Sequence, residues 1–480
     1  MRRKFFTNLS LLLLLNLLIK PFWIFGIDRT VQNVVGAEEY GLYFSLFNFS
    51  LLLNMLLDLG ITNYNNRNIA QNQQLVSKSL SNIVGLKLVL AVLYAIVTII
   101  AGFFIGYEWR QFQILIFLIL NQFIASFILY LRSNLSGLHY FKTDSIISVL
   151  DRALMIIICS FLLWGGLTDI SFKIEWFVYS QTLAYIITAL ITLVLVYSKA
   201  ELLRLNFDIP YFIATLKKSY PYALLALLMV FYYRVDSVML ERLLPDGKEQ
   251  AGIYAQSFRI LDALAMFAFL FAVLLLPIFS RMIKQKESVN QLTLFSFLLL
   301  IVPVLGVSLA SYFYRVEIID LLYHQHVEIS SSIFGVLILC FIGISIGYIF
   351  GTLLTANGSL RELNILAGAS VLVNIILNLI LIPKYYAFGS AVASLITQSF
   401  TGIIQIVIAK RIFKFNINFK RILSILLFAT AVFIVAKISL FIDLLWIYKF
   451  VGIIVAAIML AFIFRLINLK VLYDLVKNGD

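Results

Sequence analysis

Long apolar runs, separated by short polar segments, extend over the whole chain. Fourteen of these runs are close to membrane length, and they are continuous in Leu and Ile instead of alternating between apolar and polar residues. A transmembrane helix needs about 20 mostly apolar residues, whereas the strands of a membrane barrel alternate. The pattern therefore predicts an all-α polytopic membrane protein with about 14 transmembrane helices. The predicted spans cover residues 6–26, 40–60, 80–103, 112–132, 145–164, 175–197, 219–241, 251–279, 289–311, 331–355, 361–382, 386–409, 421–442 and 446–467.

The segments between the spans are short. The longest inner connection is residues 198–218, near the middle of the chain, and the longest outer one is residues 312–330. Neither is long enough for a soluble domain, since domains typically have at least 50 residues. We therefore expect the function to depend on the helices themselves.

Lys and Arg are distributed unevenly between the two sides of the predicted membrane. With the N-terminus in the cytoplasm, the inner segments hold 23 of these residues and the outer segments hold 8. Cytoplasmic loops of membrane proteins are enriched in Lys and Arg. We therefore expect both termini to be cytoplasmic.

Two stretches of the chain look alike at a distance of six spans. Asp28 lies thirteen residues before Gly41 in Tyr40-Gly41-Leu42-Tyr43, and Asp236 lies sixteen residues before Gly252 in Ala251-Gly252-Ile253-Tyr254. An even displacement keeps the orientation, so the pattern predicts two parallel-repeat six-helix lobes, an architecture found in transporters. We expect an N-terminal lobe at 1–198, a linker at 199–218, a C-terminal lobe at 219–410, and two C-terminal helices with a tail at 411–480.

Composition supports the membrane assignment and excludes several functions. The chain is 62% hydrophobic and only 13% charged, against about 25% charged in soluble proteins. Cys159 and Cys340 lie far apart in apolar runs, without the spacing of a zinc or disulfide site. The net charge of +13 comes without a long basic run, so we attribute it to membrane topology. We expect no nucleic-acid partner, metal or cofactor.

Several fragments, in their order and span positions, resemble one family of transporters. They are Val35-Gly36 to Gly41-Leu42-Tyr43, Leu57-Asp58-Leu59-Gly60-Ile61, Asn66-Arg67, Tyr233 to Leu240, Gly252-Ile253-Tyr254, Ala356-Asn357-Gly358, Asn374 with Asn378, Ile382-Pro383 and Gly389 to Gln398. The chain resembles the polysaccharide-export branch of the multidrug/oligosaccharidyl-lipid/polysaccharide exporter superfamily, and within it the O-antigen flippases. The resemblance implies fourteen spans, two six-helix lobes, a bacterial cytoplasmic membrane and a lipid-linked oligosaccharide as substrate. Membrane lipids and other polysaccharide assembly proteins are the further partners it implies.

Charged residues inside the spans are the candidates for function, because each costs about 2.5–3.5 kcal/mol on insertion. A lipid pyrophosphate is best bound by cations, above all by the planar fork of Arg. Lys20, Arg234 and Arg259 lie in spans 1, 7 and 8, which line the cleft between the lobes in the resembled family. We therefore expect them to bind substrate. The structural alternative pairs Arg259 with Asp262, and Arg234 with Asp236 or Glu241.

Other charges fit different roles. Coupling to an ion gradient would need a carboxylate in the cleft, for which Asp28, Asp236 and Asp262 are the options; proton coupling, sodium coupling and no coupling all stay open. Lys87, Arg152 and Asp58 lie near cytoplasmic ends of spans, from which side chains can extend toward the membrane surface. We expect these three, and the peripheral Lys437, to be structural.

Three functions fit the sequence to different degrees. The first is a non-enzymatic flippase that moves an undecaprenyl-pyrophosphate-linked oligosaccharide by alternating access. The second is an exporter of drugs or peptidoglycan precursors from the same superfamily. The third is a membrane-embedded glycan polymerase or ligase, which we would expect to need a larger outer loop than residues 312–330. The cation-rich spans favour an anionic substrate and hence the first function.

Overall fold

The computed structural model describes residues 14–62, 76–138, 140–166, 172–198, 209–415 and 419–466. These residues form helices, turns and bends, without any strand. Eleven of their helices are long and apolar enough to cross a membrane. The prediction of an all-α polytopic membrane protein is therefore confirmed. By packing, the chain divides into two compact units, residues 1–255 and 256–480.

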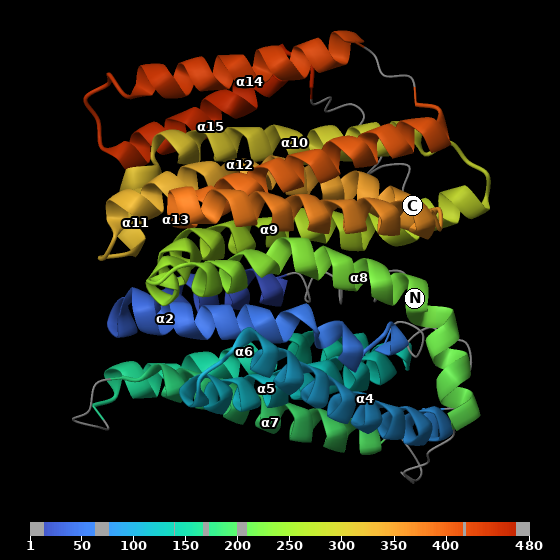
Figure 1. Ribbon diagram of the computed structural model, residues 1–480. Coiled ribbons are helices and arrows are strands. Elements are labelled where there is room, and N and C mark those ends of the chain that lie inside the picture. Colours follow the sequence, from blue (N-terminus) through green and yellow to red (C-terminus); the bar gives the residue numbers. More distant parts are fainter. Residues whose placement is uncertain are drawn as a thin grey trace. The chain divides into compact units, whose positions relative to one another are not determined.

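The first unit begins with a helix over residues 14–22, followed by the π-helix η1. Its long helices α4, α5, α6 and α7 correspond to predicted spans 3 to 6, and α8 corresponds to span 7. Their contacts join α5 with α7, α6 with α7, and α2 with α8 (Figure 1). The elements are η1 (Trp23–Asp28), α2 (Arg29–Leu52), η2 (Asn54–Leu57), α4 (Val76–Ile105), α5 (Trp109–Gly137), α6 (Phe141–Trp164), α7 (Ile174–Tyr197) and α8 (Ile209–Leu243).

Helix α9 (Gly247–Lys284) begins in the first unit and continues in the second. The second unit is built around α12 and α13, which form its most extensive helix pair, and around the packing of α10 on α12. The two C-terminal helices α14 and α15 pack on each other and on α10 (Figure 1). The elements are α10 (Asn290–Phe313), α11 (Arg315–Leu322), α12 (Val327–Ala356), α13 (Leu360–Phe413), α14 (Phe419–Ser439) and α15 (Trp446–Ile463).

In two places, one helix follows another with a single non-helical residue between them. Gly36 in α2 has φ 83° and ψ 170°, so the first helix continues as far as Val35 and the next begins at Ala37. This φ suits glycine, which has no Cβ to clash. Tyr386 (φ 55°) separates predicted spans 11 and 12 within α13. The polar segment expected between spans 1 and 2 is thus helical on both sides of Gly36.

The faces of the helices differ as expected of a membrane protein. Inward positions form a core; in the first unit it includes Ile83, Leu131 and Ile147 from α4, α5 and α6. Outward positions carry large apolar side chains, such as Phe104, which is 89% exposed. In lipid such a surface is favourable, because the surrounding solvent is itself apolar.

The predicted lobes and the packing units have different boundaries. The contacts place α8 and the start of α9 with the first unit, whereas the sequence repeat assigns them to the second lobe. The lobes stay a prediction. Of the expected linker 199–218, residues 199–208 lie outside the described residues. Residues 1–13, which include the start of the first predicted span at residues 6–26, and the tail from residue 467 also lie outside them.

Candidate substrate-binding site

Lys20 lies on the first described helix, one residue before Pro21, and it is half-buried. The helix is attached to α6 by a hydrogen bond from the Asn16 side-chain amide to the Ser148 hydroxyl, 3.1 Å long. Proline removes a backbone donor and disturbs the regular ladder, and the π-helix Trp23–Asp28 begins two residues later. Single-turn π segments within helices are frequent at functional sites.

Charged residues of two other helices lie near Lys20. They are Arg152 and Asp151 of α6, and Arg132 of α5. Arg132 is paired with Asp144 at 2.7 Å, and Arg152 Nε lies 3.7 Å from an Asp151 oxygen. Counted formally, three cations and two carboxylates give this group one net positive charge. We call Lys20, Arg132, Arg152, Asp144 and Asp151 the Lys20 cluster.

Arg152 is placed by aromatic rings. Its guanidinium lies 5.6 Å from the centroid of Trp23 and 5.8 Å from that of Tyr185 on α7. Cation–π contacts at these distances orient a guanidinium plane. The expectation that Arg152 is purely structural did not anticipate this position beside Lys20, because only the fold brings spans 1, 5 and 6 together.

Arg234 and Asp236 lie on α8. Asp236 is buried and accepts a hydrogen bond from the Tyr254 hydroxyl at 3.0 Å. The half-buried Arg234 has its guanidinium 5.0 Å from the ring of its neighbour Tyr233. Glu241, the other partner suggested for Arg234, is bonded to Gln111, Ser45 and Arg242.

Asp28 makes the same kind of bond as its counterpart in the repeat. It is buried and accepts from the Tyr40 hydroxyl at 2.8 Å. The two tyrosines lie in the motifs around Gly41 and Gly252, although at different positions, Tyr40 before the glycine and Tyr254 after it. The role of Asp28, Asp236 and Asp262 in ion coupling stays a prediction.

Arg259 and Asp262 belong to the second unit. Both are half-buried on α9, one helical turn apart. This spacing puts them on the same face of the helix, as the sequence predicted. Their part in substrate binding or in coupling stays a prediction.

Lys87 and Asp58 form a buried ion pair. Lys87 is 1% exposed, and its ammonium group lies 2.6 Å from an Asp58 oxygen, with the Leu57 carbonyl and the Ser126 hydroxyl each at 3.0 Å. The expectation that Lys87 extends toward the membrane surface was therefore wrong, whereas its structural role is supported. Because the ammonium group of Lys87 has its ion-pair and hydrogen-bond partners inside the protein, the side chain does not need to reach water.

Comparison with known proteins identifies the family to which the chain belongs. A family model described as polysaccharide biosynthesis protein matches residues 7–283, more than half of the chain. No curated protein sequence matches significantly.

Solved structures show the same fold at low sequence identity. A structure of the lipid II flippase MurJ in an inward closed conformation has a TM-score of 0.67 and 17% identity, and the match covers 94% of this chain and 98% of that one. A multidrug resistance MATE family transporter of the MOP superfamily, in an inward-facing conformation, has a TM-score of 0.63 and 15% identity, with 85% and 97% covered. A MOP superfamily transporter from Pyrococcus furiosus follows, at 0.58 and 16%, with 85% and 93% covered.

The family match and the fold agree with the resemblance carried by the sequence fragments. The chain is a multi-pass membrane protein of a transporter fold, and it belongs to the polysaccharide biosynthesis protein family.

Proposed function

We propose that this protein is a flippase that moves an undecaprenyl-pyrophosphate-linked oligosaccharide across the bacterial cytoplasmic membrane. The observation that carries the proposal is the Lys20 cluster, a net positive group of side chains on apolar helices. A charged side chain within the membrane costs free energy, and such residues usually line a pathway for a substrate or an ion. The family match and the flippase among the structural neighbours support it.

The chemistry of the cluster suits a pyrophosphate. The ammonium of Lys20 is a compact point charge, whereas the guanidinium of Arg152 can donate two parallel hydrogen bonds to phosphate oxygens. Both side chains are half-buried, and a lower local dielectric strengthens their attraction for an anion. Transport then follows by alternating access, in which two helix bundles rock about a binding site.

The test measures flipping in proteoliposomes with a fluorescent undecaprenyl-pyrophosphate-linked oligosaccharide, using an impermeant reductant to quench the outer leaflet. We expect Lys20→Ala to lower the rate at least tenfold. The matched control is Lys437→Ala, which removes an exposed lysine from α14 and should keep the wild-type rate. Equal rates for both variants would show that the cluster does not bind substrate.

Arg234 has a separate test in the same assay. Arg234→Ala should abolish flipping, and Arg234→Lys should restore it only in part, because a point charge replaces a planar fork. Normal flipping by Arg234→Ala would remove this residue from the proposed site.

A second set of measurements in the same assay distinguishes the possible substrate classes. Lipid II and a cationic drug replace the oligosaccharide lipid in matched liposomes. We expect the oligosaccharide lipid to be moved faster than lipid II, and the drug not to be moved. Preference for lipid II would favour a peptidoglycan-precursor exporter instead.

A further inference from the structure

The glycines of the two repeat motifs touch each other's backbone. A Cβ on Gly41 of α2 would lie 2.6 Å from the Gly252 nitrogen and would overlap the Lys248 carbonyl oxygen. A Cβ on Gly252 would overlap the Ala37 carbonyl oxygen. The close approach is thus reciprocal: each repeat motif packs against the chain beside the other. Small residues at such a point let two helix backbones approach closely.

Buried hydrogen bonds extend this contact from α2 to the start of α9 and to α8. The Gln32 side-chain amide donates to the Gly252 carbonyl at 2.9 Å, and the Asn48 amide donates to the Ser237 hydroxyl at 2.9 Å. All three polar side chains are at most 2% exposed. Buried polar groups need such partners, so separating α2 from α8 requires water to reach these positions.

Glu241 is the hub of the contact. One carboxylate oxygen accepts from the Gln111 amide of α5 at 2.6 Å. The other lies 2.9 Å from Arg242 Nε and accepts from Ser45 of α2 at 3.4 Å. Glu241 therefore joins three helices through one charge, although it is only 7% exposed.

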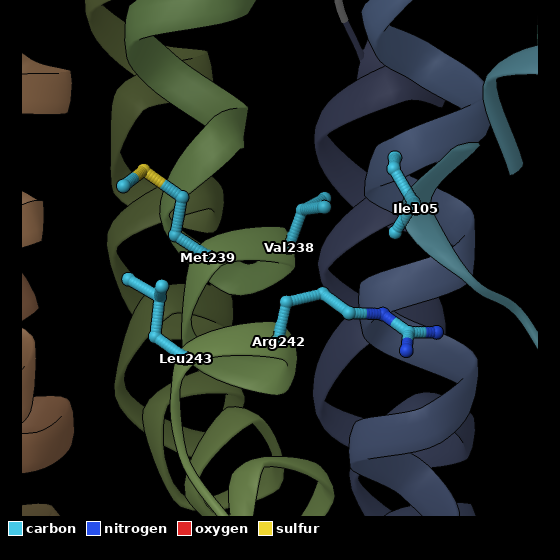
Figure 2. Close-up of a pocket in the computed structure, with 5 residues that line it drawn as sticks. All are labelled: Ile105, Val238, Met239, Arg242 and Leu243. Atoms are coloured by element: carbon cyan, nitrogen blue, oxygen red, sulfur yellow. The ribbon is translucent and has the colours of Figure 1, made fainter.

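Arg242, the ion-pair partner of Glu241, extends these contacts toward the surface. Its guanidinium lies 4.3 Å from the centroid of the Tyr107 ring and donates to the side-chain amide oxygen of Gln111 at 3.1 Å. Burial, with Glu241 as a nearby negative charge, raises the pKa of the Tyr107 hydroxyl, so the ring stays neutral beneath the cation. Figure 2 shows Arg242 extending from α8, while Met239 and Leu243 point to the opposite side.

Two pockets adjoin Arg242, and they would give water access to Glu241 once the contact opens. One, of about 410 Å³, is lined by Ile105, Val238, Met239, Arg242 and Leu243 (Figure 2). Another, of about 440 Å³, is lined by Glu38, Glu108, Gln111, Glu241, Arg242 and residues 245–249. Water in the second pocket would hydrate Glu241 and Gln111 after separation. Hydration of these groups would then replace the bonds of the closed contact, as a conformational switch requires.

We propose that this contact of α2 with α8 and the start of α9 is a latch, held by Glu241, that keeps the outer side of the transporter closed. The Lys and Arg distribution places the connection between α8 and α9 on the outside. Opening toward the outside then requires Glu241 to exchange Gln111 and Ser45 for water. The inference rests on the alternating access of the proposed function.

A disulfide tests whether the contact must open. Asn48→Cys and Ser237→Cys are introduced together after Cys159 and Cys340, both buried, are replaced by Ala. We expect an oxidant to link the pair and to reduce flipping at least tenfold, with recovery after reduction. Failure of the link to form, or flipping by the linked protein at the unlinked rate, would overturn the latch.

Thiol labelling tests Glu241 independently of any substrate. In the cysteine-free protein, Ala37→Cys reports on the surroundings of Gly252, and an impermeant maleimide is added from outside. Glu241→Ala should raise the labelling rate at least fivefold. The matched control Glu38→Ala removes an exposed carboxylate from the same pocket and should leave the rate unchanged. Equal rates for the two variants would overturn the role of Glu241, whereas absence of flipping by the parent protein would contradict only the proposed function.

Discussion

Charged side chains on the apolar helices are held in three different ways. Lys87 is closed into an ion pair with Asp58, Arg152 is placed between two aromatic rings beside Lys20, and Asp28 accepts a tyrosine hydroxyl. A buried charge that is already neutralised has little left to offer a ligand, whereas a group with net charge does. The surroundings of each charge, more than its depth in a span, therefore separate structural from functional candidates.

The Lys87 pair should be a stability determinant. Removing one partner leaves an uncompensated charge in the protein, so Lys87→Ala should destabilise by about 3 kcal/mol. The double variant Lys87→Met with Asp58→Asn should recover much of the loss, since both charges are gone. Thermal unfolding in detergent measures the difference, with Lys437→Ala as the control. An unchanged midpoint for Lys87→Ala would show that the pair contributes nothing.

Arg152 should depend on its shape as well as on its charge. Arg152→Lys keeps the cation but loses the planar stack on Trp23 and Tyr185 and the bidentate fork. We expect it to raise the substrate concentration for half-maximal flipping several-fold while protein abundance stays normal. If Arg152→Lys flips as the wild type does, only the charge matters at this position.

At the scale of helices, the positions of breaks and glycines determine how the elements pack. Gly36 and Tyr386 end one helix and begin the next without a loop. Gly343 of α12 lies directly against the Gln398 backbone of α13, while Gly347 and Gly351 contact the Gln405 side chain. These small residues let the two helices approach closely. Close approach of α12 and α13 thus organises the second unit.

Two glycines of the second unit offer a matched comparison. A Cβ at Gly343 would lie 2.8 Å from the Gln398 carbonyl, whereas a Cβ at Gly368 of α13 would meet nothing within 4 Å. Gly343→Ala should destabilise by about 1–3 kcal/mol through overpacking. Gly368→Ala should be neutral or stabilising, because Ala has the higher helix propensity. Thermal unfolding of the two variants side by side checks this, and the reverse order would contradict the packing.

At the scale of the whole molecule, short connections and uneven loop charge are typical of a multi-pass membrane protein. The longest predicted outer segment, residues 312–330, contains the short helix α11. Its cap, Tyr314, is buried, and its hydroxyl lies 2.7 Å from that of Ser439 at the end of α14. This predicted outer segment is thus joined to the end of α14 in its own unit, and α11 packs on α12.

The orientation in the membrane is a prediction of the loop charges. A reporter fused after Asp480 should be active only in the cytoplasm, and one inserted in residues 312–330 should be active only outside, because Lys and Arg favour the inner side. Paired enzymatic reporters for the two compartments measure both sites in cells. Activity of both fusions on one side would contradict the five spans predicted between the two sites.

The local pattern of residues was sufficient for the helices. Predicted spans 3 to 14 coincide with helices, and Pro383 with Tyr386 marks the break between spans 11 and 12. The reason is physical: a backbone in lipid must satisfy its own hydrogen bonds, so a long apolar run can only be helical. The matched motifs around Gly41 and Gly252 were also visible, since each is a short stretch of sequence.

The partners of the charges were decided by the tertiary structure. Hydropathy singled out Lys20, Lys87, Arg152 and Arg234, but it gave Lys87 the wrong surroundings and did not join Arg152 to Lys20. It also could not show that Gly41 meets Gly252 or that Gln111 reaches Glu241, across 130 residues of chain. Such contacts depend on which helix faces meet, and that follows from side-chain packing between distant segments. The sequence alone thus determined a bundle of membrane helices with charges inside it, and the packing decided which charges neutralise one another and which leave a net positive site.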